Sequence, residues 1–125
     1  MNEQNEQNGQ NKQNDQATNQ GAYHIDRAKW ARLSIFEQMG NVGSEVGRAL
    51  AAKRRGDDKS AQAALVRGLD LLDATAEVWE AKHSPRVREI LIARQQFVQA
   101  IEGPDDDPKL EAYFMWFAFV ARRDR

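Results

Sequence analysis

The sequence predicts an all-α protein, an antiparallel up-down-up-down four-helix bundle that follows a disordered Asn/Gln-rich tail. Three observations carry this prediction. Four segments repeat apolar residues at spacings of three and four, the pattern of a helix with one buried face. Capping residues, Gly or Pro bound these segments, as expected of helix ends. No window alternates apolar and polar residues as a half-buried strand would.

The predicted tail covers residues 1–22. Its first 20 residues include 6 Asn and 6 Gln, mostly as an Asn-x-Gln triplet, and lack Val, Ile, Leu, Phe, Tyr and Trp. Such a segment cannot bury apolar surface, so we expect it to be disordered. The alternative is a polar arm that orders on a partner or self-associates through carboxamide ladders.

The bundle is expected over residues 23–125, within the single domain that 125 residues suggest. Its first residues are too irregular to assign, but their apolar members can pack across the body as a lead-in. These members are Tyr23, Ile25, Trp30 and Leu33.

The first predicted helix spans residues 34–55. Ser34 and Glu37 have the spacing of a capping box, in which each side chain accepts from the other residue's backbone amide. Gly56 is expected to end the helix, because it tolerates the left-handed conformation that terminates helices. The apolar face consists of Ile35, Met39, Val42, Val46 and Leu50.

Three further helices are predicted over residues 58–82, 85–102 and 108–123. Pro85 and Pro108 stand where a helix can begin, because the first helical amide needs no partner within the helix. The connecting loops are short, so consecutive helices are expected to lie antiparallel and next to each other.

Three glycines in the first predicted helix need an explanation. Gly40, Gly43 and Gly47 lie along one edge, and each costs about 1 kcal/mol against Ala within a helix. An edge without Cβ atoms lets another helix backbone approach closely. That helix belongs to the same chain or to a second subunit, or the space admits a ligand. Gly43 and Gly47 are therefore candidates for a partner interface.

The last predicted helix is too apolar for a surface helix. Residues 113–121 read YFMWFAFVA, without a charge. One face can point into the bundle, and Met115, Trp116 and Phe119 then point elsewhere. Either the lead-in covers this second face or a second subunit or another protein does. These three residues are the leading candidates for a contact surface, and a homo-oligomer or protein partner is expected.

Arginines are expected to gather at one end of the bundle. Arg outnumbers Lys 12 to 6, and the body is slightly basic although the whole chain carries −1. A basic end could bind the phosphates of RNA or DNA, because Arg recognises phosphate with two donors at once. The alternative is an ordinary solvated face. The candidate phosphate-binding residues are Arg86, Arg88, Arg122, Arg123 and Arg125.

Polar residues are also expected between the helices. Glu45 and Arg48 share a turn, Asp70 and Asp73 share a face, and Arg94 falls on an inward stripe. A buried Arg needs carboxylates, so Arg94 is expected to pair with Glu45, Asp70 or Asp73. Such a network either holds the helices in register or forms a ligand pocket or active site.

Several function classes are not expected from the composition. Zero cysteine excludes disulfides, cysteine-held zinc and thiol nucleophiles. Glu80 and His83 have one half of a di-iron spacing, but the second half is missing, so no metal and no cofactor are expected. No apolar stretch approaches a membrane span, and no export signal opens the chain. A cytoplasmic location is the default expectation.

Residues 33–46, LSIFEQMGNVGSEV, resemble the opening of a group of short prokaryotic four-helix-bundle proteins with no known activity. The similarity continues at residues 64–73, 86–94 and 113–123 and covers about residues 30–123. It implies a helical bundle. In architecture alone, the chain is similar to the proteins of 23S rRNA intervening sequences and to accessory proteins of diversity-generating retroelements. Fold does not define function.

Together these observations favour a non-enzymatic helical protein that acts through self-association or a protein partner. A nucleic-acid-binding accessory protein that uses the basic end is the first alternative. A ligand pocket or enzyme built on the Arg/carboxylate cluster is the second.

Overall fold

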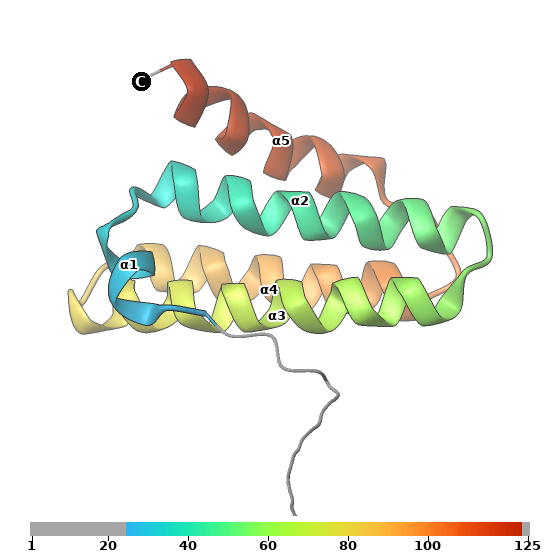
Figure 1. Ribbon diagram of the computed structural model, residues 1–125, viewed down its shortest axis with the longest axis horizontal. Coiled ribbons are helices and arrows are strands. Elements are labelled where there is room, and N and C mark those ends of the chain that lie inside the picture. Colours follow the sequence, from blue (N-terminus) through green and yellow to red (C-terminus); the bar gives the residue numbers. More distant parts are fainter. Residues whose placement is uncertain (1–24, 124–125) are drawn as a thin grey trace, which may run out of the picture.

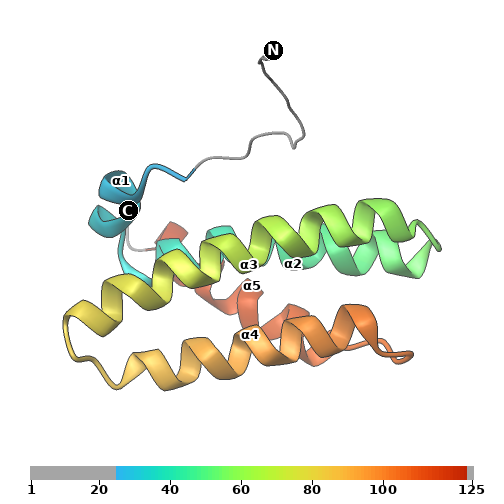
Figure 2. The same cartoon turned by 90° about the horizontal axis from the view of Figure 1, so that it is seen from below.

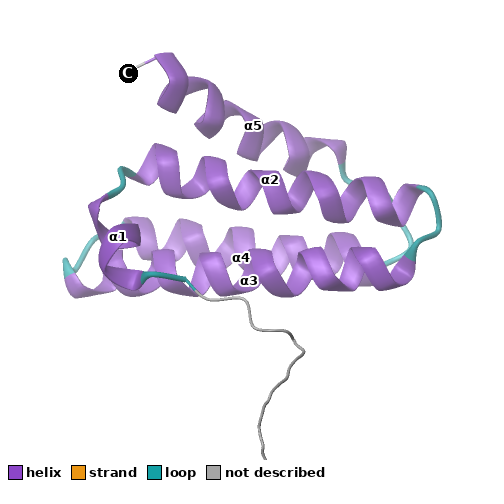
Figure 3. Cartoon of the chain, viewed as in Figure 1, coloured by secondary structure: helices purple, strands orange, loops and turns teal. Residues whose placement is uncertain are grey.

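The computed structural model describes residues 25–123, and this part of the chain is all-helical, with five helices and no strand (Figure 3). The expected all-α class is confirmed. The predicted tail lies outside the described residues, as do Tyr23 and Arg125. The helices are α1 (Arg27–Arg32), α2 (Ile35–Arg54), α3 (Asp58–Ala81), α4 (Arg86–Glu102) and α5 (Pro108–Arg123).

Helix α1 is the element that the sequence pattern did not predict. Asp26 caps it by accepting from the backbone amide of Lys29 at 3.2 Å. The helix has only 6 residues, too few for an apolar repeat to appear. It nevertheless buries Trp30 against α3, so the lead-in does pack on the body.

Helices α2 to α5 begin and end where local chemistry indicates. At the start of α2, Ser34 Oγ accepts from the amide of Glu37 at 3.1 Å, and Glu37 Oε1 accepts from the amide of Ser34 at 2.9 Å, which confirms the capping box. Gly56 follows α2 with a left-handed φ of 76°. After α3 the same conformation falls on His83, at φ 53°, although it carries a side chain.

The helices form layers with α2 in the middle. Helices α3 and α4 make one layer, α2 lies on it, and α5 is outermost, inclined to α2 (Figures 1 and 2). Helix α2 packs extensively on α3 and on α5, whereas α5 makes few contacts with α4. The core between these layers is built around Met39, Leu50, Leu72, Phe97 and Phe114, each almost fully buried.

The glycine edge of α2 brings α5 close. A Cβ on Gly40 would lie 3.1 Å from Ala118 Cα, and a Cβ on Gly43 would lie 2.9 Å from Phe114 Cβ. Gly47 is less crowded, since its nearest neighbour would be Glu111 Oε2 at 4.0 Å. Among the three alternatives for this edge, Gly40 and Gly43 therefore serve contact within the chain.

The turn between α4 and α5 is held from α2. The ammonium group of Lys53 donates to three backbone carbonyls that follow or end α4, those of Ala100 at 2.6 Å, Gly103 at 2.8 Å and Asp105 at 2.7 Å. A cation there also suits the negative end of the helix dipole. The neighbouring Arg54 binds the carboxylates of Asp106 and Glu111. The start of α5 is thus fixed to the end of α2.

Gly43 and Gly47 lie on the same edge of α2 but differ in how closely α5 approaches them, and this difference gives a paired prediction. Gly47→Ala should raise the free energy of unfolding by roughly 0.5–1 kcal/mol, because Ala favours the helix and its Cβ makes only an ordinary van der Waals contact with Glu111 Oε2. Gly43→Ala gains the same helix propensity but forces Phe114 and α5 outward, so it should be less stable than wild type by about 1 kcal/mol. Urea denaturation of both variants measures this difference, and equal stabilisation by the two substitutions would contradict the close packing.

Candidate functional site

The outer face of α5, defined as Ala112, Met115, Trp116 and Phe119, is the leading candidate site. Met115 is 61% exposed, Trp116 55% and Phe119 54%. The opposite face of the helix is buried against the body through Leu110, Phe114, Phe117 and Val120. Large apolar side chains grouped on one exposed face are typical of contact surfaces. The structure thus places the three sequence-predicted residues together, and none is covered by α1.

Two of these side chains contact neighbouring groups of the same chain, Trp116 two aromatic rings and Phe119 a guanidinium. Trp116 lies edge-on to Phe36 and to Phe117, with ring centroids 5.9 Å and 5.1 Å away. The guanidinium of Arg123 lies 6.0 Å from the Phe119 ring centre. Aromatic contacts of this kind restrict the side chains before any partner binds. The outer face of α5 is therefore an ordered apolar surface with a basic residue at its edge.

The glycines predicted for a partner interface lie elsewhere. Gly43 is beneath Phe114 on the inner side of α5, and Gly47 is on the same edge near Glu111. A third position was missed altogether. Gly68 on α3 lies under the Phe97 ring, where a Cβ would come within 2.5 Å of Cε2. It lets α4 approach α3 as Gly43 lets α5 approach α2.

The candidate phosphate-binding arginines fall on two helices. Arg86 and Arg88 open α4, while Arg122 and Arg123 end α5, and these helix ends point to the same end of the molecule (Figure 1). Arg86 lies over the Trp79 ring, 5.6 Å from its centre. Because α4 and α5 hardly touch, these residues form two small basic groups in the described part of the chain.

The expected polar network consists of two separate groups, one between α3 and α4 and one between α2 and α3. Arg94 on α4 binds Asp73 on α3, with Nε 2.8 Å from Oδ1, and this hydrogen bond raises the Arg94 pKa. Both side chains are more than a third exposed, so Arg94 is not on the buried stripe as expected. Asp70 lies close enough to add a coulombic contribution but forms no ion pair with Arg94.

Glu45 is the buried member of the second group and lies 7% exposed between α2 and α3. Arg48 binds it from the next turn at 3.1 Å, as expected, and Arg67 on α3 binds it at 3.2 Å. Arg67 was missed by sequence reasoning. Glu45 and Arg67 are equally far from Gly56 in the sequence. In a helical hairpin that turns at Gly56, such residues lie side by side, and this spacing could have predicted the pair. With separate partners, the two groups do not form one catalytic or ligand-binding cluster.

A third polar group, which the sequence did not predict, joins α1 to the body. The Gln38 side chain is fully buried, donates to the Trp30 carbonyl at 2.9 Å and accepts from Trp79 Nε1 at 2.7 Å. Trp30 Nε1 in turn donates to Thr75 Oγ1 at 3.0 Å. Both polar atoms of the Gln38 side chain and the Trp30 indole nitrogen have hydrogen-bond partners within the chain, so the network is structural.

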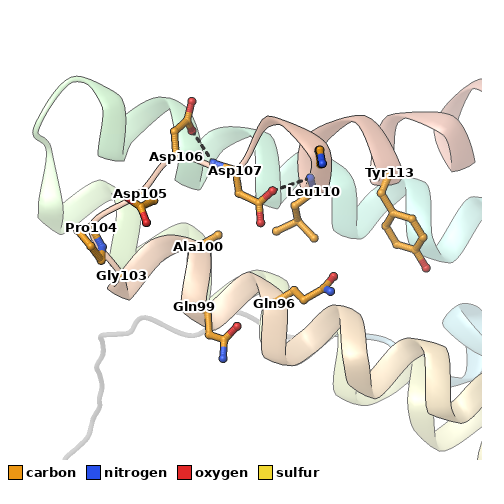
Figure 4. A pocket seen from close by; sticks show the side chains of 11 residues that line it. Gln96, Gln99, Ala100, Gly103, Pro104, Asp105, Asp106, Asp107, Leu110 and Tyr113 are labelled. Carbon is orange, nitrogen blue, oxygen red and sulfur yellow. Dashed lines mark hydrogen bonds between the residues drawn. The ribbon is translucent and has the colours of Figure 1, made fainter.

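A hollow of about 510 Å³ lies between the end of α4 and the start of α5 (Figure 4). The acidic turn, residues 105–107, and Tyr113 of α5 border it on one side, and Gln96 and Gln99 of α4 border it on the other. The Tyr113 hydroxyl has no hydrogen-bond partner in the described residues, and its burial, with the nearby Glu89 carboxylate, raises its pKa. The hollow exists because α5 rests on α2 instead of α4.

Two further observations concern residues 25–123. No three His, Cys, Asp or Glu side chains lie together there in a way that could hold a metal ion. None of the five helices has the length and apolar character needed to cross a membrane.

Comparison with known proteins does not assign the chain to a family. No protein-family model matches the chain, and no curated protein and no solved structure is significantly similar to it.

The Gln38 network leads to a stability prediction. Gln38→Met keeps the side-chain length but leaves the Trp79 indole without its acceptor and the Trp30 carbonyl with only the Leu33 amide, so the free energy of unfolding should fall by about 2 kcal/mol. Gln99→Met, on the exposed side of α4, is the matched control and should change little. Urea denaturation followed by tryptophan fluorescence measures both. A Gln38→Met protein as stable as wild type would disprove the role of the network.

Proposed function

We propose that this chain is a non-enzymatic helical protein that acts by associating with protein through the outer face of α5. One observation carries the proposal. Met115, Trp116 and Phe119 are each more than half exposed on the same face of a helix whose other face is buried.

The exposed apolar area of this face can supply the free energy of association. Burying apolar surface is worth roughly 25 cal/mol per Å², and aromatic side chains offer the largest areas. Trp is among the residues that most often dominate binding energy in protein interfaces, and Phe and Met are enriched there. The Trp116 ring is also held by Phe36 and Phe117, which lowers the entropic cost of ordering it on binding.

The other two candidate functions have weaker support. Nucleic-acid binding needs several arginines on one surface. The candidate arginines are divided between α4 and α5, two helices that make few contacts with each other. An active site needs its charged groups to converge, and Glu45 and Arg94 have different partners. The association surface is the arrangement that the described residues favour.

The proposal is tested by photo-crosslinking in cells of the source organism. A photoreactive phenylalanine analogue replaces Phe119 in the full chain, and in a matched control it replaces Leu91, which is 49% exposed on α4. Irradiation should yield covalent adducts from position 119 and markedly fewer from position 91. Equal labelling at both positions, or no adduct from position 119, would overturn the proposal.

A further inference from the structure

We infer that the partner of the α5 outer face is an acidic amphipathic helix of a different protein, with carboxylates at both ends of its apolar stripe. This inference rests on the proposed association surface and names the chemistry of its occupant. It comes from the spacing of the apolar residues on that face and from the sign of the charges that border it.

The apolar residues of the outer face have the spacing with which one helix contacts another. Along α5 its members stand at positions i, i+3, i+4 and i+7, which are Ala112, Met115, Trp116 and Phe119. Residues at these spacings form one stripe along a helix, and the side-chain ridges of such a stripe pack into the grooves of a second helix. We therefore expect the occupant to be a helix with a matching apolar stripe.

Basic side chains lie at both ends of this stripe. Lys109 precedes it, Arg122 and Arg123 follow it, and all three are exposed. The guanidinium of Arg123 lies over the Phe119 ring, while Lys109 and Arg122 form no ion pair within the described residues. Since a helix rises 1.5 Å per residue, Lys109 and Arg122 lie about 20 Å apart along the axis. A complementary helix therefore needs carboxylates at a similar separation.

Carboxylates near this face are directed elsewhere. Glu111, the one acidic residue within α5, binds Arg54 at 3.0 Å. Glu37 of α2 lines a hollow with Arg122, but its carboxylate accepts from the Ser34 amide. The aspartates of the turn before α5 border the hollow on the α4 side. The charge that the outer face presents to a partner is therefore basic.

The same charges disfavour a second copy of this chain as the occupant. In an antiparallel pair of α5 helices whose apolar stripes meet, Lys109 of each copy lies opposite Arg122 of the other. In a parallel pair, each of these basic residues lies beside its own counterpart. Both arrangements place like charges at two symmetric positions, which costs free energy. A surface that repels itself in this way selects a partner of opposite charge.

The exclusion of a second copy is tested by sedimentation equilibrium of the full chain. Lys109→Glu places a carboxylate opposite Arg122 in the antiparallel pair, so this variant should self-associate on the order of tenfold more tightly than wild type. The double variant Lys109→Glu/Arg122→Glu again has like charges at both ends and should return to the wild-type behaviour. A Lys109→Glu chain that associates no more tightly than wild type overturns the inference.

The sign of the partner's charge is tested with two synthetic helical peptides that share one apolar stripe. One carries Glu at both ends of the stripe, about 20 Å apart, and the other carries Lys at the same positions. Fluorescence anisotropy of the labelled peptides should show that the full chain binds the Glu peptide on the order of tenfold more tightly, and added salt should reduce this difference. Equal binding of the two peptides, or no binding of either, overturns the inference.

Charge reversal in the chain completes the peptide test. The double variant Lys109→Glu/Arg122→Glu should prefer the Lys peptide. The control Lys29→Glu/Lys59→Glu changes the net charge equally at exposed positions of α1 and α3 and should keep the wild-type preference. A preference that both double variants change alike reports net charge alone and overturns the inference. Circular dichroism of every variant verifies that the helices are retained.

The adduct formed in cells from position 119 separates this inference from the proposed function. Mass spectrometry of the adduct should identify a segment of another protein that has Asp or Glu on both sides of its apolar residues. An adduct with a neutral or basic segment, or with a second copy of the chain, leaves the association surface in place and overturns its acidic partner. The absence of any adduct from position 119 overturns the proposed function and this inference with it.

Discussion

The close approach of α5 to the glycine edge of α2 is the constraint on which the rest of the arrangement depends. A helix usually buries one stripe, but α2 lies between two neighbours and packs on both. Its Val and Leu stripe faces the layer of α3 and α4, while its second side has glycines in place of bulk. Helix α5 is thereby attached to α2 and carried away from α4.

Two consequences of this attachment define the surface of the molecule. The inner half of α5 is buried well enough to hold the helix, through Phe114 and Phe117, while Met115 and Phe119 on the other half face outward. The space left beside α4 forms the hollow near Tyr113. Both features follow from the packing of α5 on α2 and not on α4.

Polar contacts then fix how the helices are set against one another. Each helix pair has its own pairing: Gln38 with Trp79 and Glu45 with Arg67 for α2 and α3, and Asp73 with Arg94 for α3 and α4. Apolar packing tolerates small slips along a helix axis, whereas a buried Gln or Glu loses its partner when it slips. These pairings give the layers a defined register.

The sequence predicted the features that depend on neighbouring residues and missed those that depend on distant ones. Capping by Ser34 and termination at Gly56 are local, and α2 to α5 begin and end within one residue of the expected ranges, whereas α1 was not expected. The exposed apolar face of α5 was also readable, because one helix had more apolar residues than one face can bury. Gln38 and Gly68 gave no local signal, since their roles arise only when Trp30 and Phe97 arrive from other helices.

The position of α5 also bears on how the chain folds. The α2–α3 and α3–α4 pairs join helices that follow each other through short loops, and contacts of this kind form quickly. The α2–α5 pair joins the first long helix to the last, so the chain must close its longest loop before the glycine edge is covered. We expect α2, α3 and α4 to assemble first and α5 to dock late. The ammonium hydrogen bonds of Lys53, to Ala100 at the end of α4 and to Gly103 and Asp105 in the turn that follows, then hold the start of that last helix in place.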